Sequence, residues 1–144
     1  MGQQPDKLSL DIVTPTEHLV YKQVDEVNIP GAEGDFGVLL DHTPFLTSLR
    51  PGVLSYRIGK EQHCIAVSEG FAEVLPRRVI VLAQTAESSA SISKDRAQAA
   101  QQRAKERLEK AAKGAHDIDV RRAEMALARA VARLTVLSFQ RSRS

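Results

Sequence analysis

The chain changes character between residues 79 and 97, which read VIVLAQTAESSASISKDRA. All six prolines lie before this stretch, as do five of the six aromatic residues, and only Phe139 follows it. Beyond it, the chain is rich in alanine, arginine, glutamine and glutamate, which favour helices. We therefore place a boundary near Ala86 and predict two domains, residues 1–86 and 87–144.

Upstream of the boundary, the sequence is typical of short β-strands. Residues 8–13, 24–29 and 53–58 are rich in β-branched side chains and partly alternate apolar with polar. Proline and glycine turn signals separate such runs, and residues 63–67 and 79–83 would supply further strands. The spacing predicts an antiparallel β-sandwich of about eight to ten strands. We expect the aromatic side chains of this domain to lie in its core.

Downstream of the boundary, the pattern predicts two helices. Residues 93–113 contain neither glycine nor proline and carry alanine and leucine at spacings of three and four. Ser93 is suited to cap the start of this helix, and Gly114 is suited to end it. A second apolar stripe begins after a further cap, Asp117 or Asp119, and predicts the second helix.

The short connection between these helices makes them antiparallel, so the predicted fold is α+β, a sandwich followed by a helical hairpin. We expect each helix to cover the apolar stripe of the other, and the second helix to fray near Ser138. The stripe of the first helix is mostly alanine, whose burial stabilises far less than that of leucine or phenylalanine. The hairpin is therefore either an arm that can leave the body or a permanently docked element, and composition favours neither.

The two parts of the chain differ in charge. Residues 1–85 hold 7 Lys and Arg against 11 Asp and Glu, whereas residues 86–144 hold 13 against 7. A basic arm on an acidic body is unlike a nucleic-acid module, because no aromatic residues are interleaved with the arginines for base stacking. Hydrophobic residues at 42% and charged residues at 26% are typical of a folded globular protein.

The sequence lacks the common catalytic and metal signatures. It has no phosphate-binding loop, no Cys-x-x-Cys pair, no His-Glu-x-x-His motif and no Gly-x-Ser-x-Gly elbow. Its four histidines lack metal-ligand spacing, and its single cysteine, Cys64, lies in an apolar run where we expect a buried thiol. We expect no catalytic residue, no metal, no secretory leader and no membrane-spanning helix.

Four short segments of the first domain carry a further signal. Residues 30–39 read PGAEGDFGVL and are followed by HTP at 42–44, LRPG at 49–52 and EGFAEV at 69–74. In this order, and with a helical hairpin after them, the segments resemble the epsilon subunit of F-type ATP synthases of the bacterial type. The resemblance extends over residues 8–139.

The resemblance implies a non-catalytic subunit of the central stalk, or rotor, of a proton-translocating synthase. In that family the sandwich contacts the gamma subunit and the membrane c-ring, and couples rotation to the catalytic head. The chain would then be peripheral, at the cytoplasmic face of the cell inner membrane, and would reach the membrane only through the complex. Glu33 and His42 would lie at the gamma-facing edge, or else be plain turn residues. At Glu69 many relatives carry glycine, and we expect this difference to alter only a local turn.

The resemblance also implies a regulatory arm. In the family, the helices are thought to extend along gamma and block ATP hydrolysis. The second helix would contact acidic segments of the catalytic beta subunits through Arg122, Arg129 and Arg133, because positive charge suits an acidic surface. The alternatives are a basic face that is merely solvated, or a general protein-interaction scaffold with a basic helical arm.

Some epsilon subunits bind ATP through the motif Ile/Leu-Asp-x-x-Arg-Ala at the start of the first helix, which this chain matches in part. The residues at the positions of that site are Glu87, Ile92, Arg96, Ala97, Arg103, Arg122, Arg129 and Arg133. Ser93 replaces the aspartate, and a hydroxyl cannot reproduce the charge-assisted hydrogen bonds of a carboxylate. No cofactor is required on this reading, and regulatory ATP binding should be weak or absent.

Overall fold

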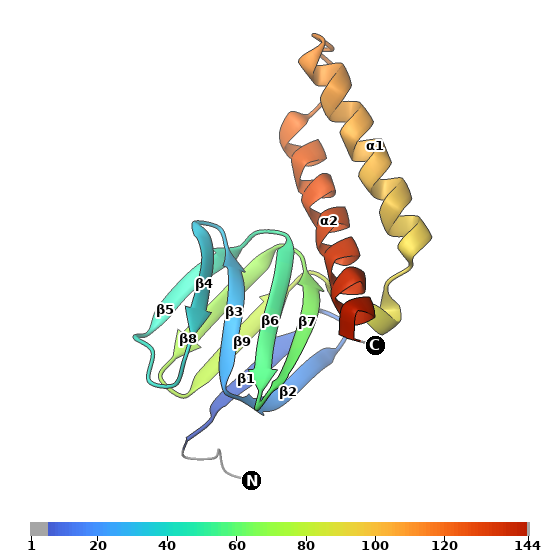
Figure 1. Cartoon of the computed structure of the whole chain (residues 1–144). Helices are drawn as coiled ribbons and strands as arrows, with labels where there is room; N and C mark the ends of the chain where they lie inside the picture. Colours follow the sequence, from blue (N-terminus) through green and yellow to red (C-terminus); the bar gives the residue numbers. More distant parts are fainter. Residues whose placement is uncertain (1–5, 144) are drawn as a thin grey trace.

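Residues 6–143, which the computed structural model describes, form a β-strand body followed by a helical arm (Figure 1). The strands are β1 (Leu8–Val13), β2 (His18–Val24), β3 (Glu26–Gly31), β4 (Gly34–Val38), β5 (Phe45–Leu49), β6 (Gly52–Ile58), β7 (Glu61–Val67), β8 (Gly70–Leu75), β9 (Arg78–Ala83) and β10 (Ala86–Glu87). A short 3₁₀ turn, η1 (Ser89–Ser91), leads into the helices α1 (Lys94–Ala112) and α2 (Val120–Arg143). The predicted α+β fold, a sandwich followed by a hairpin, is confirmed.

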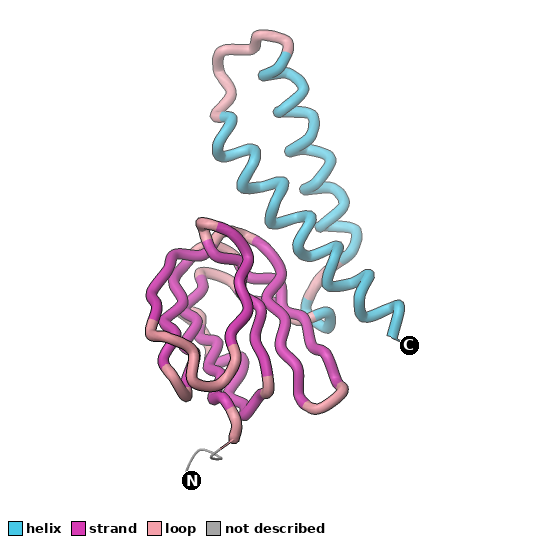
Figure 2. The backbone as a smooth tube through the Cα atoms, turned by 60° about the vertical axis from the view of Figure 1, so that its left-hand side comes forward, coloured by secondary structure: helices cyan, strands magenta, loops and turns pink. Residues whose placement is uncertain are grey.

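The strands follow one hydrogen-bonded order, β10-β7-β6-β3-β5-β8-β9-β1-β2, with β4 attached to β3. Strand β3 joins the two layers, because it pairs with β6 and β4 but meets β5 only through Gly31 and Leu49. Figure 2 shows the strands curving around a common interior. The β1–β9 pairing is parallel, and the other pairings among the described strands are antiparallel.

The interior of the sandwich is aliphatic. Leu10 and Ile12 of β1, Leu54 of β6 and Val81 of β9 are fully buried. Complete burial of such a side chain stabilises a fold by about 1.5–3 kcal/mol. The core cluster to which these residues belong consists of residues between Leu8 and Ala86, so the body has its own core without the arm.

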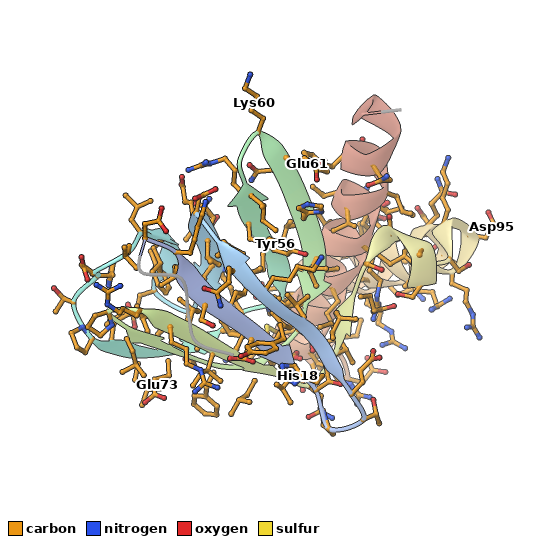
Figure 3. All side chains as sticks on the ribbon, turned by 90° about the horizontal axis from the view of Figure 1, so that it is seen from below. His18, Tyr56, Lys60, Glu61, Glu73 and Asp95 are labelled. Carbon is orange, nitrogen blue, oxygen red and sulfur yellow. The ribbon has the colours of Figure 1, made fainter. Side chains whose placement is uncertain are left out.

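The aromatic residues mostly contradict the expectation that they fill the core. Tyr56 does lie inside the sandwich, where burial raises the pKa of its phenol (Figure 3). Phe36 is partly buried and packs against the core. Tyr21, Phe45 and Phe71 are exposed, and two of them lie on the outer surface of the sheet described below.

The ends of the helices follow local capping rules. The Ser93 hydroxyl accepts a hydrogen bond from the Arg96 amide at 3.3 Å, and α1 ends just before Gly114, whose φ of 98° suits glycine. The Asp119 carboxylate accepts from the Arg122 amide at 3.1 Å and so caps α2. The expected fraying near Ser138 is wrong, because α2 continues to Arg143. Within residues 6–143, neither helix is long and apolar enough to cross a membrane.

Helix α2 has two apolar faces, whereas the sequence suggested one. It packs against α1, in which Ala97 and Ala104 are buried, and it also packs on β6 and β7 (Figures 1 and 2). On this second face, Ala132 and Val136 form a cluster with Ala66 of β7. The arm therefore stands against the body through α2, and α1 lies on the outer side.

Candidate functional site

A hollow of about 240 Å³ lies where the body meets the base of the arm. Strand β10 supplies Glu87, the start of α1 supplies Ser93, Arg96 and Ala97, and α2 supplies Arg133. Arg133 donates from Nε to Glu87 Oε1 at 2.8 Å, and the two side chains are 29% and 27% exposed. The hollow therefore combines one carboxylate with two guanidinium groups.

This hollow gathers only part of the ATP site suggested by the sequence. Glu87, Arg96, Ala97 and Arg133 line it, whereas Ile92 packs on the Ala66–Ala132–Val136 cluster. The remaining three arginines do not line it: Arg103 is exposed on α1, Arg122 lies near the start of α2, and Arg129 pairs with Glu69.

The chemistry of the hollow does not favour a highly charged anion. The carboxylate of Glu87 already accepts from Arg133, so a phosphate group would have to displace it to reach that guanidinium. Ser93 is occupied as the cap of α1. Arg96, in the first turn of α1, is the remaining cation on this surface. An anion could therefore contact Arg96 directly, but could reach Arg133 only in competition with Glu87.

A second ion pair joins the arm to the body. Arg129 donates from Nη1 to Glu69 Oε1 at 2.6 Å, with the two side chains 33% and 41% exposed. The structure therefore corrects the expectation that Glu69 alters only a local turn. The sequence does contain one signal for this arrangement, because Arg129 and Arg133 are four residues apart and so share a helix face. It does not show which carboxylates that face would meet.

The predicted edge residues Glu33 and His42 come together. They line a surface hollow of about 370 Å³ with Asp35, Phe36 and Phe45. Phe36 and Phe45 pack edge to face, with ring centroids 5.3 Å apart. The hollow lies at the β3–β4 turn and the loop after β4, at the border between the two layers.

The sequence did not indicate an apolar surface on the outside of β5, β8, β9, β1 and β2. Strand register places Tyr21, Leu46, Phe71 and Leu82 on the same side, and they are 52–68% exposed. We call these four residues the outer face. Large exposed apolar surfaces on soluble proteins commonly mark protein interfaces.

One buried carboxylate lies on the same side of the sheet as these four residues. Asp11 of β1 is 3% exposed, and it accepts from Arg78 Nε at 3.0 Å and lies 2.9 Å from His18 Nε2. Because a buried carboxylate needs partners, these contacts fix the side chains of β1, β2 and β9 relative to one another. Within residues 6–143, no group of three or more His, Cys, Asp or Glu side chains is placed to hold a metal ion.

Comparison with known proteins matches both parts of the chain. Residues 7–89 match the family described as ATP synthase, delta/epsilon chain, beta-sandwich domain, and residues 91–138 match the corresponding long alpha-helix domain. The ATP synthase epsilon chain of Syntrophobacter fumaroxidans is 47% identical over 131 residues, which cover 91% of this chain and 96% of that protein. The epsilon chain of Desulforapulum autotrophicum is 46% identical over 134 residues, covering 92% and 96%.

Solved structures share the fold. A chain in the Euglena gracilis mitochondrial ATP synthase, solved as OSCP, F1 and c-ring, superposes with a TM-score of 0.77 at 22% identity, over 94% of this chain and 84% of that one. A chain in the central stalk and c-ring of the Tetrahymena thermophila enzyme superposes with a TM-score of 0.52 at 14% identity, over 63% and 72%. On the family matches and the identity to the bacterial epsilon chains, this chain belongs to the ATP synthase delta/epsilon chain family.

Proposed function

We propose that this chain is a non-catalytic subunit of the central stalk of a proton-translocating F-type ATP synthase. It would lie at the cytoplasmic face of the cell inner membrane and couple rotation of the c-ring, through the gamma subunit, to the catalytic head. Membership of the family supports the assignment to the complex. The observation that carries the coupling role is the outer face, because a rotor subunit needs a firm attachment to a neighbouring rotor chain.

The outer face suits a permanent partner. Its four large side chains would be covered in an assembled stalk, and removal of such area from water is the main source of affinity at the centre of an interface. The hollow at Glu33 and His42, beside the packed rings of Phe36 and Phe45, would form a second contact. We assign both surfaces to the gamma subunit.

Changing Phe71 to aspartate should separate the chain from gamma. Phe71 is 58% exposed, so the change leaves the free body folded. A carboxylate buried at the interface with gamma would weaken the binding free energy by about 2 kcal/mol or more. That corresponds to binding roughly 30-fold weaker. The measurement is co-purification of the tagged chain with gamma and the catalytic subunits. Val120→Asp, at an exposed apolar residue on the arm, is the matched control and should co-purify like the wild type. Equal recovery of a folded Phe71→Asp chain would contradict the assignment.

We further propose that the helical arm restrains ATP hydrolysis when it leaves the body. Arg122, Arg129 and Arg133 would then be available to acidic segments of the catalytic beta subunits. In the docked arm, two of these arginines already bind carboxylates of the chain itself. Docking therefore neutralises the charges that the inhibitory contact would use, and this supports a switch over a permanently solvated basic face.

Regulatory ATP binding by the isolated chain should be weak, with a dissociation constant of about 1 mM or above. The reasons are that Arg133 is already bound to Glu87 and that the Ser93 hydroxyl carries no charge. Ser93→Asp restores the carboxylate of the motif and should tighten binding by about tenfold, the value of one charge-assisted hydrogen bond. Ser91→Asp adds the same charge to the same hollow, outside the motif, and is the control. Calorimetry with MgATP tests both. Micromolar binding by the wild type, or an equal gain from Ser91→Asp, would contradict this assignment.

A further inference from the structure

We propose that Glu69 and Arg129, together with Glu87 and Arg133, form an electrostatic latch that sets how long the arm stays docked. We call Glu69–Arg129 and Glu87–Arg133 the latch pairs. The inference concerns the docked arm of the chain by itself and does not depend on the proposed function. The proposal that the arm can leave the body does not say what holds it. The latch names the side chains that hold the arm and the change in charge or salt that would release it.

The latch carboxylates are held rigidly by the backbone of the body. The carbonyl of Glu69 accepts from the Gln84 amide at 2.8 Å, and Glu87 lies in β10, where it pairs with Ala66 of β7. Between them, the Ser68 amide donates to the Thr85 carbonyl at 3.0 Å. The two carboxylates are therefore presented from neighbouring, hydrogen-bonded segments at one edge of the sandwich.

The latch arginines match this spacing. Arg129 and Arg133 are one helical turn apart on α2, and each donates to a different carboxylate, at 2.6 and 2.8 Å. Because both pairs are fixed at once, they determine the position of α2 along the edge as well as its distance from it. A helix shifted by one turn would break at least one pair.

The apolar contact beside the latch is built mainly from small side chains. Ala132 and Val136 are buried with Ala66, and Val53, Cys64 and Ile92 pack against them, so this contact stabilises the docked arm in proportion to its apolar area. The charged groups add to this contact and fix its register. Both pairs are partly exposed, so each is modest and sensitive to salt.

Loss of Glu69 would leave an excess of positive charge against the body. The surface between α2 and the β7–β8 connection is lined by Arg121, Arg122 and Arg129, and Glu69 is the body carboxylate that faces them there. Asp119, on the same surface, is already bound to the backbone as the cap of α2. The arginines released from the latch would be free for another anion, so docking and external anion binding exclude one another.

The test is hydrogen exchange of the α2 amides at residues 132–137 in the full-length chain, at low and high ionic strength. Glu69→Gln keeps the shape of the side chain but removes its charge. We expect exchange roughly 2–5-fold faster in low salt, the range for one partly exposed ion pair. The wild type should reach or exceed this rate at about 0.5 M salt, where the Debye length falls to a few ångströms and both latch pairs are screened. The variant should be less sensitive to salt than the wild type, because Glu87–Arg133 is then the one latch pair left to screen.

Two further variants make the result specific. Glu73→Gln removes an exposed carboxylate from β8 on the side of the body away from the arm and should change neither the rate nor its salt dependence (Figure 3). Glu69→Arg combined with Arg129→Glu reverses the pair and should exchange more slowly than Glu69→Arg alone, which leaves arginines facing one another. Amides of β1 and β9 report on the body and should stay unchanged throughout. Exchange in Glu69→Gln equal to that of the wild type at both ionic strengths would overturn the latch, and would leave the gamma-binding test unaffected.

Discussion

Replacing Gly70 by alanine is expected to lower the free energy of unfolding of the sandwich by about 3 kcal/mol or more. Gly70 opens β8 and pairs with Leu49 of β5 on one side and with Ala83 of β9 on the other. A Cβ at this position would lie 1.9 Å from the backbone oxygen of Leu82 and 2.9 Å from the Cα of Ala83. Because both contacts are to backbone, no side-chain rotation can relieve them, and β8 and β9 have to separate.

The measurement is thermal unfolding followed by circular dichroism, in which a loss of this size lowers the Tm of a small domain by about 12–24 °C. Gly59→Ala is the matched control. Gly59 lies in the β6–β7 turn with φ of 61°, and a methyl group added there would meet no atom within 4 Å, so only left-handed backbone strain of about 1–2 kcal/mol is expected. Equal Tm values for the two variants would show that β8 and β9 relax around the clash.

The ends of the helices were the best-predicted features of the arm, because they depend on residues that are neighbours along the chain. The cap at Ser93, the stop at Gly114 and the absence of glycine and proline between them depend on residues within a few positions, and the structure has α1 at Lys94–Ala112. The start of α2 after Asp119 follows the same rule. Such signals are readable in one sequence because the groups that satisfy each other are neighbours along the chain.

The second face of α2 was missed for a physical reason. A stripe at helical spacing identifies the most apolar side of a helix, and the side that faces the sheet is built from Ala132 and Val136 between arginines. The spacing of Arg129 and Arg133 shows that they share a helix face, but it does not show which carboxylates that face meets. Glu69 and Arg129 are 60 residues apart, and only the folded body shows that the carboxylate lies beside the helix.

The outer face was missed because aromatic residues were assigned to the core. Strand alternation assigns Phe71 to one side of β8 and Ala72 to the other, but it does not say which side is inside. The inside is decided by contacts between strands that lie far apart in the sequence, such as β1 and β9, whose parallel pairing joins Ser9 to Arg78. In the folded body the small and branched residues fill the interior, and Phe71 and Tyr21 are left exposed on the outer face.

Opposite changes in ATP hydrolysis are expected when the arm is removed and when it is released. Ending the chain after Ser91 removes both helices but keeps β10, and the core of the body lies within residues 8–86. If half of the complexes are held by the arm at any time, its removal should raise hydrolysis by the assembled synthase about twofold, and more if the held fraction is larger. Val136→Asp should do the reverse.

Val136→Asp should release the arm because it places a charge in the apolar contact between α2 and the body. Val136 is 2% exposed against Ala66 and Ala132, so an aspartate there is an unpartnered buried charge, which costs about 3–5 kcal/mol. The arm is held by the apolar cluster around Val136 and by the latch pairs, and the buried charge falls in the middle of that cluster. We therefore expect α2 to leave the body, by a shift of more than about 100-fold in the docking equilibrium, while the core between β1 and β9 stays folded.

The rate of ATP hydrolysis by the assembled synthase then distinguishes an arm that inhibits after release from an arm that only stabilises the stalk. An arm that inhibits after release makes Val136→Asp less active than the wild type, whereas the truncated chain is more active. An arm that only stabilises the stalk makes both variants change in the same direction, and that outcome would contradict the inhibitory role. Val131→Asp places the same charge on the exposed side of the same helix, at a residue that is 42% exposed, and should leave hydrolysis unchanged. A change in Val131→Asp equal to that in Val136→Asp would show that added charge, and not undocking, is what the enzyme senses.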